Sequence, residues 1–191
     1  FIFIFSPISS SPPPSLSPCA FLPRASTPWP GRRDARVLFA TLQTSPASPA
    51  IAFDQLPLKN AFTQVRGNGK RKLVVFADPN CGYCKRFEKD LQKLDNVTIY
   101  HLLYPILGED SKTKSRHIWC TKDKAKTWND WMINGTTPAT ASCDTAAVDA
   151  TVEFGKKQRI TGTPTLFFAD GTRVPGAVPL AQVEKMLADI K

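Results

Sequence analysis

The sequence predicts an α/β fold, because its segments follow one another in the order strand, helix, strand, helical insert, hairpin and helix. Three observations carry this prediction. The apolar run LVVFAD (residues 73–78) leads directly into a charged segment with apolar residues at helical spacing. A second run, VTIYHLLY (residues 97–104), is rich in the β-branched and aromatic residues that favour strands. The segment TLFFADGTRV (residues 165–174) has Asp170-Gly171 between two short apolar stretches, which predicts a hairpin and an antiparallel sheet edge.

Length and composition favour one ordinary globular core. The chain has 191 residues, of which 42% are hydrophobic, and this is enough for one domain with an appendage. The formal net charge is +9, but after residue 55 the lysines and arginines are interleaved with acidic residues, so we do not expect nucleic-acid binding. No apolar run reaches the ~18 residues that a membrane-spanning helix requires.

Residues 1–50 differ in composition from the rest of the chain. They are crowded with serine and proline, as in SPISSSPPPSLSP, and show neither strand nor helix periodicity. Four arginines and a single acidic residue give a balance typical of an organellar transit peptide. We therefore expect a disordered or targeting-like segment, with a misjoined start as the alternative, and we interpret its one cysteine, Cys19, as incidental.

The segment FDQLPLKNAFTQVRG is expected to form a linker helix over residues 51–68. Phe53, Leu56, Phe62 and Val65 fit most of one helical face, which is broken or started near Pro57. The Gly-Asn-Gly sequence at residues 67–69 then ends the helix. A compact domain is expected to follow over residues 69–191.

Four further segments have helical character. CKRFEKDLQKL follows the first strand, and its Phe87, Leu91 and Leu94 fall on one face. A helical insert over about residues 108–158 contains a tryptophan-rich part, residues 112–135, and a second part that begins at a plausible Asp144 N-cap. LAQVEKMLADI, at the end of the chain, supplies a closing amphipathic helix.

The pair Cys81-Gly82-Tyr83-Cys84 stands between the first strand and its helix. A lone Cys-x-x-Cys can be a metal site, a structural staple or a redox reagent. At the first turn of a helix, the Cys81 sulfur would lie near free backbone N–H groups and the positive end of the helix dipole, which favours a thiolate. Cys84, one turn later, would point inward and suits a resolving thiol, and Lys85 adds a nearby cation.

Four separated motifs resemble, in order, the thioredoxin superfamily and more narrowly the catalytic domain of the DsbC and DsbG periplasmic disulfide isomerases. They are CGYC (residues 81–84), IWCTKDKAK (118–126), the Cys143 segment and TGTPTLFFADGTRVPG (161–176), within a resemblance that covers about residues 53–191. It implies a thioredoxin-like fold with a helical insert. It also implies thiol:disulfide interchange, as isomerase or reductase, with Cys81 as nucleophile, Cys84 as resolving thiol, and no metal or organic cofactor.

The resemblance implies further site residues. Thr163-Pro164 would have a cis peptide bond beside the sulfurs and leave the Thr163 backbone free to pair with an extended substrate. Gly82 and Tyr83 would support the active site, and Tyr83, exposed at the helix start, would tune the pair or touch substrate. Cys120 and Cys143 would form a structural disulfide, which closes a loop of about 24 residues and contributes ~3 kcal/mol in the chain-entropy model.

The implied partners are disulfide-containing substrate proteins and a membrane-bound or soluble thiol–disulfide reductant. The dimerisation domain of such proteins is not recognisable in residues 1–50, so dimerisation is not expected. The resemblance implies the periplasm, which agrees with a structural disulfide. An organelle such as a plastid is the alternative if residues 1–50 are a transit peptide.

Two other function classes stay open. Zinc could be bound by Cys81, Cys84, Cys120 and either His117 or Cys143, although there is no second Cys-x-x-Cys. A non-catalytic, chaperone-like binding module would instead use exposed apolar surface. Thiol exchange needs no base, so His101 is expected to be a strand residue and His117 a helix-surface residue. The remaining polar and aromatic candidates are given structural roles: Asp78 as a strand-end cap, and Trp119, Trp128 and Trp131 in helix packing.

Overall fold

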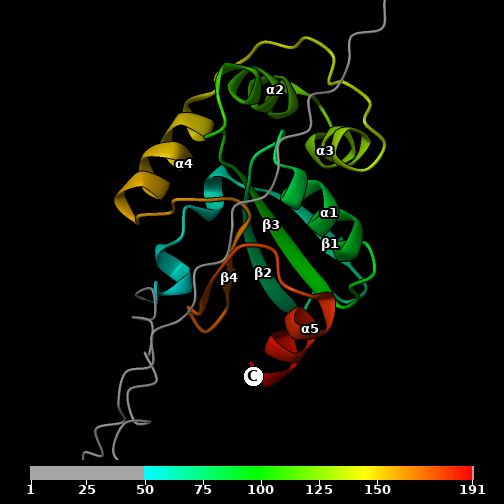
Figure 1. Cartoon of the computed structure of the whole chain (residues 1–191), viewed down its shortest axis with the longest axis vertical. Coiled ribbons are helices and arrows are strands. Elements are labelled where there is room, and N and C mark those ends of the chain that lie inside the picture. The colour runs from blue at the N-terminus through cyan, green and yellow to red at the C-terminus, as the bar shows by residue number, and fades with distance from the viewer. Residues whose placement is uncertain (1–49, 191) are drawn as a thin grey trace, which may run out of the picture. The chain divides into compact units, whose positions relative to one another are not determined.

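The computed structural model describes residues 50–190, and in them a mixed sheet is packed between helices (Figure 1). The strands are β1 (Phe62–Arg66), β2 (Arg71–Ala77), β3 (Val97–Leu103), β4 (Thr165–Phe168) and β5 (Arg173–Pro175). The helices are α1 (Gly82–Leu91), α2 (Glu109–Cys120), α3 (Lys124–Met132), α4 (Ala146–Lys157) and α5 (Leu180–Asp189). The predicted α/β class is confirmed. The expectations for residues 1–49 lie outside the described residues.

The sheet has the strand order β1-β3-β2-β4-β5. Its central pair, β2 and β3, is parallel, whereas β1, β4 and β5 each pair antiparallel to a neighbour. The predicted hairpin joins β4 to β5, and Gly171 in its turn has a φ of +85°, a conformation that glycine adopts without strain.

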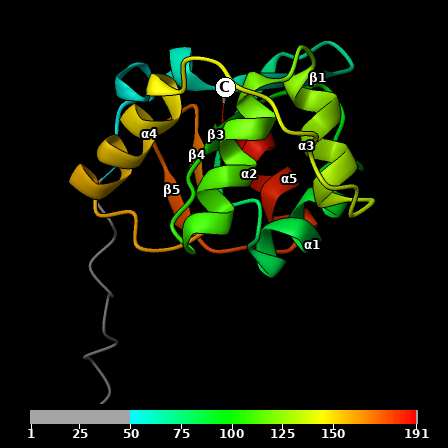
Figure 2. The same cartoon turned by 90° about the horizontal axis from the view of Figure 1, so that it is seen from above.

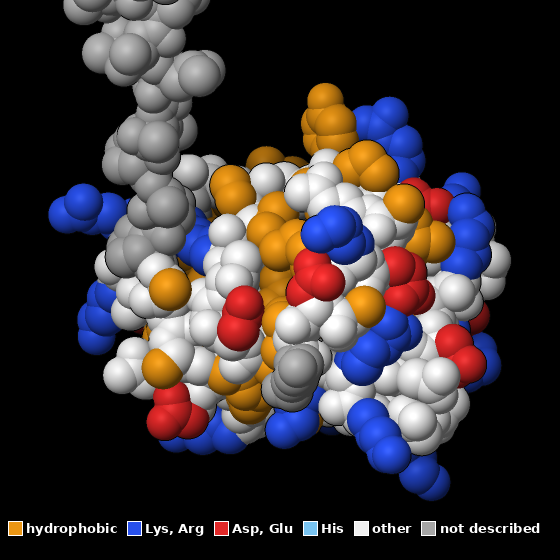
Figure 3. All heavy atoms as spheres, turned by 90° about the horizontal axis from the view of Figure 1, so that it is seen from below, with side chains coloured by type: hydrophobic (Ala, Val, Ile, Leu, Met, Phe, Trp, Pro, Cys, Tyr) orange, Lys and Arg blue, Asp and Glu red, His pale blue; other side chains and the backbone are white. Residues whose placement is uncertain are grey.

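The interleaved positive and negative side chains expected from the sequence are visible on the face in Figure 3.

Alternation along β2 divides the buried residues between two cores. Leu73, Val75 and Ala77 pack with apolar residues of α1, α3 and α5. Val74 and Phe76 face the other way and pack with residues of the segment before β1 and of α4. Figure 2 shows α4 on one side of the sheet and α1 and α5 on the other. Because β2 is covered on both faces, it is a continuous apolar run, as the sequence predicted.

Residues 51–68 do not form the predicted linker helix. Two short 3-10 turns, Phe53–Gln55 and Leu58–Asn60, precede β1, whose residues alternate between buried and exposed. Pro57 forces the residue before it into an extended conformation, which interrupts a helix at that point. The backbone of β1 is then satisfied by pairing with β3, and Val65, expected on the apolar face of a helix, is 64% exposed in this strand.

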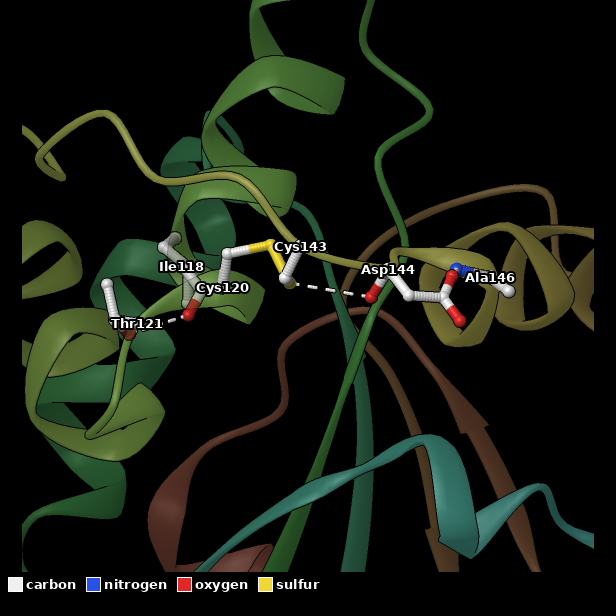
Figure 4. Close-up of a disulfide and its surroundings, with 6 residues drawn as sticks. All are labelled: Ile118, Cys120, Thr121, Cys143, Asp144 and Ala146. Carbon is white, nitrogen blue, oxygen red and sulfur yellow. Dashed lines mark hydrogen bonds between the residues drawn. A yellow bond between two sulfur atoms is a disulfide. The ribbon is translucent and has the colours of Figure 1, made fainter.

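The helical insert lies between β3 and β4 and contains α2, α3 and α4. The predicted tryptophan-rich helix is divided into α2 and α3 near Asp123, whose carboxylate caps α3 by accepting from Lys126 N at 2.9 Å. A disulfide joins Cys120, at the end of α2, to Cys143, in the segment before α4 (Figure 4). Within residues 50–190, no helix has the length and apolar character to cross a membrane.

Candidate active site

Cys81 and Cys84 lie where β2 gives way to α1. Cys81 is the N-cap residue of α1, and its sulfur accepts a hydrogen bond from Cys84 N at 3.3 Å. The first backbone N–H groups of a helix have no partner within the helix, so a sulfur at the N-cap is in a position to take one of them. Both thiols are free, and both side chains are buried, Cys81 at 6% and Cys84 at 3% exposure.

The segment that contains Thr163 and Pro164 lies against the cysteine pair. The Thr163-Pro164 peptide bond is cis, and the Cys81 sulfur lies 3.3 Å from the Thr163 carbonyl oxygen, to which its thiol donates. The fold thus brings together residues 82 positions apart in the sequence. Gly82 and Tyr83 are exposed, and Tyr83 keeps 63% of its surface open beside the Arg86 guanidinium, 4.6 Å from the ring centroid.

The pKa values of the two cysteine thiols are shifted in opposite directions. A hydrogen bond from the Cys84 side chain lowers the pKa of Cys81 to about 6, although burial opposes this shift. The same hydrogen bond, together with burial and the charge of Cys81, raises the pKa of the Cys84 thiol far above its ordinary value. At neutral pH, Cys81 is therefore a thiolate and Cys84 a thiol. A thiolate is the attacking form in disulfide exchange.

The ammonium group of Lys85, the cation expected near Cys81, lies over an aromatic ring. Its Nζ is 3.8 Å from the ring centroid of Trp131, and burial together with the charge of Lys114 lowers the pKa of Lys85. The pKa of Cys81 is lowered by hydrogen bonds, of which the one from the Cys84 side chain has the largest effect.

Asp78 has a larger structural role than the strand-end cap expected from the sequence. Its carboxylate is fully buried and accepts from four donors, all between 2.7 and 2.9 Å. The donors are Asn80 N, Ile106 N, Leu107 N and Ser111 Oγ. Asp78 thus fixes the loop after β3 to the segment that leads into Cys81. In the sequence, an acidic residue at the end of a buried strand indicates a capping role. It does not indicate the wider network, because three of the four donors lie about 30 residues downstream.

The remaining candidates fall outside the cysteine pair. His101 is buried in β3, its Nδ1 lies 3.8 Å from Glu88 Oε2, and burial lowers the pKa of His101. His117 is partly buried on α2. The alternative zinc set is not assembled, because Cys120 and Cys143 are bonded to each other. In the part of the chain that the structure describes, no group of three or more His, Cys, Asp or Glu is arranged to hold a metal ion.

Comparison with known proteins decides the family. A family model described as a thioredoxin-like domain matches residues 58–191. The chain belongs to this family. The curated relatives of this thioredoxin-like chain include a probable thiol:disulfide interchange protein DsbC from Bordetella pertussis, 49% identical over 138 residues. They also include the thiol:disulfide interchange protein DsbC of Escherichia coli, 34% identical over 122 residues.

These matches have a defined extent. The Bordetella match covers 72% of this chain and 49% of that protein, and the Escherichia match covers 62% and 51%. The chain therefore spans about half the length of the curated relatives it matches. The crystal structure of a disulfide interchange protein from Neisseria gonorrhoeae aligns with 41% identity and a TM-score of 0.66, over 69% of this chain and 96% of that one. The thioredoxin-like fold expected from the sequence is confirmed.

Proposed function

We propose that the chain catalyses thiol:disulfide interchange on cysteine-containing proteins through Cys81 and Cys84, without a metal or organic cofactor. One observation carries the proposal: two adjacent free thiols have pKa values shifted in opposite directions, with Cys81 at about 6 and Cys84 raised. An activated nucleophile beside a protonated thiol is the arrangement that stepwise disulfide exchange requires. The names of the relatives agree with this chemistry.

The proposed reaction has two steps. The Cys81 thiolate attacks one sulfur of a client disulfide, a Cys81–client disulfide forms, and the second client sulfur leaves as a thiolate and takes up a proton. Cys84 then loses its proton and attacks the Cys81 sulfur, so the client leaves reduced and Cys81–Cys84 becomes a disulfide. Two electrons pass from the pair to the client. In isomerisation, a client thiol attacks the mixed disulfide instead, and the enzyme is released in its reduced form.

The surface around the pair is suited to an extended client. Tyr83, Leu107 and Ile106 are exposed, at 63%, 57% and 36%. Ile106 and Leu107 are tied by their backbone N–H groups to Asp78, so these apolar side chains belong to loops at the same end of the sheet as Cys81. We propose that they contact apolar client residues, while the Thr163 backbone pairs with the client chain beside the scissile disulfide.

The Cys120–Cys143 disulfide favours an oxidising compartment. We propose the periplasm, with a plastid-like organelle as the alternative. After each reduction of a client, the Cys81–Cys84 disulfide must be reduced again, so a membrane-bound or soluble dithiol reductant is the implied partner.

An insulin assay with dithiothreitol as the reductant tests the proposal. We expect the chain to accelerate insulin reduction and a Cys81→Ser variant to leave it at the uncatalysed rate, because serine supplies no thiolate. A client-aggregation assay separates the chaperone-like alternative. If the double variant Cys81→Ser/Cys84→Ser suppresses aggregation as well as the unmodified chain, and the unmodified chain does not accelerate insulin reduction, the binding-module reading replaces this one.

A further inference from the structure

Trp131 of α3 contacts the chain on both sides of Cys81. Its indole Nε1 donates to the Pro79 carbonyl oxygen at 2.6 Å, two residues before Cys81. The Lys85 ammonium group lies over its ring, 3.8 Å from the centroid. Lys85 lies one helical turn after Cys81, and its backbone N donates to the Cys81 carbonyl oxygen at 3.0 Å. One side chain of the helical insert therefore bridges the loop before the nucleophile and the first turn after it.

The neighbours of Pro79 are held by the insert as well. Asn80 Nδ2 donates to Asp110 Oδ2 at 2.7 Å and to Ser111 Oγ at 3.1 Å, both on α2. Ser111 Oγ donates in turn to Asp78. The three residues that precede Cys81 are thus each hydrogen-bonded to the insert, and the Trp131 bond is the only one of these that comes from α3.

Two lysine side chains lie against the ring of Trp131. Lys114 of α2 places its Nζ 4.9 Å from the ring centroid and forms an ion pair with Asp110. Two ammonium groups on one indole draw α1 and α2 toward α3, because a cation is attracted to the electron-rich face of an aromatic ring. Since Trp131 is also partly buried against the main core, its indole N–H has a defined direction toward Pro79.

We infer that Trp131 is a positioning residue for Cys81, an inference that rests on the proposed function. The Cys81 sulfur accepts from Cys84 N at 3.3 Å and, when it is protonated, donates to the Thr163 carbonyl oxygen at 3.3 Å. Small rotations of the peptide units around Pro79 would move the sulfur away from Cys84 N, whose hydrogen bond is the one that the thiolate keeps. Trp131 limits such rotations by holding the Pro79 carbonyl on one side and Lys85 on the other.

Trp119 provides a matched control on the same insert. It is also partly buried against the core, and it carries Lys124 at 5.0 Å from its ring centroid. It lies beside Phe62 and Thr63 at a surface hollow lined by β1 and the start of α3, away from the residues that precede Cys81. A role confined to packing the insert would be shared by both tryptophans, whereas a positioning role belongs to Trp131 alone.

The test compares Trp131→Phe with Trp119→Phe. Phenylalanine keeps an aromatic ring for the lysines but lacks the N–H group. We expect Trp131→Phe to raise the midpoint of Cys81 thiolate formation above its value of about 6, and to slow alkylation of Cys81 at pH 5, where the rate follows the small thiolate fraction, by about threefold to tenfold, the loss of one hydrogen bond. Trp119→Phe should leave both unchanged. If the two variants lose similar thermal stability and Trp131→Phe keeps the midpoint and the rate, Trp131 is a packing residue and the inference is wrong.

An NMR measurement on the unmodified chain keeps the inference testable if Trp131→Phe does not fold. With ¹⁵N-labelled tryptophan, we expect the indole N–H signal of Trp131 to shift when the Cys81–Cys84 disulfide forms, and that of Trp119 to stay in place. Equal signals for Trp131 in both redox states would contradict the inference. The proposed function fails by a different result, an unmodified chain that forms no Cys81 thiolate near neutral pH and does not reduce insulin.

Discussion

A Cys84→Ser variant is expected to accumulate stable mixed disulfides with client proteins, whereas Cys81→Ser is expected to form none. The reason lies in the order of the two steps. The thiolate that attacks the client is Cys81, with a pKa of about 6, and Cys84, whose pKa is raised, acts only afterwards. Without Cys84 the intermediate cannot be resolved within the enzyme. Non-reducing electrophoresis of each variant, incubated with an oxidised client and quenched in acid, measures the trapped species.

The control for this experiment is the double variant Cys120→Ser/Cys143→Ser, which removes the disulfide of the helical insert and keeps both active-site thiols. It should resolve its mixed disulfides as the unmodified chain does. Equal trapping by Cys81→Ser and Cys84→Ser would contradict the assigned roles, because it would mean that either sulfur can attack first.

Asp78→Ala is expected to be the most destabilising single change at the site. The substitution leaves four donors without their acceptor, and a buried donor without a partner costs about 1–3 kcal/mol. Some of these N–H groups will reach water once the loop relaxes, so we expect a loss of at least ~3 kcal/mol in the free energy of unfolding. Urea unfolding of the reduced protein measures this loss.

Two variants bracket the Asp78 effect. Asp78→Asn keeps the shape and one acceptor oxygen and should lose less stability than alanine. Ser111→Ala removes only one donor and should lose the least, about 1 kcal/mol. If the free energy of unfolding of Asp78→Ala lies within ~1 kcal/mol of that of the unmodified chain, the carboxylate does not hold the loop before Cys81 in place.

The central strands and helices were predictable because their patterns are local. The apolar run of β2 and the helical spacing of Phe87 and Leu91 are each determined by a few adjacent residues. Residues 51–68 show the limit of this reasoning. Phe62 and Val65 fit a helical face as well as they fit a strand, and the choice is made by pairing with β3, more than 30 residues further along the chain.

The candidate site divides in the same way. Cys81 and Cys84 are recognisable from their spacing and from the strand and helix around them, and the placement of Thr163 was accessible through resemblance to a family. The sequence predicts only a strand-end cap for Asp78 and helix packing for Trp131, because the hydrogen-bond partners of both residues are brought near only by the packing of the helical insert. Such contacts depend on the tertiary fold and leave no periodic signal in the sequence.

The acidity of Cys81 is tested most directly by the absorbance of the thiolate at 240 nm. Cys19 should be replaced by serine, so that only the active-site pair titrates, and the oxidised protein serves as the blank. We expect the absorbance of the reduced protein to rise through about pH 6 and then to stay level up to pH ~9, as Cys81 ionises and Cys84 stays protonated. A first rise near the ordinary thiol value of ~8.5 would contradict the assignment of Cys81 as the activated nucleophile.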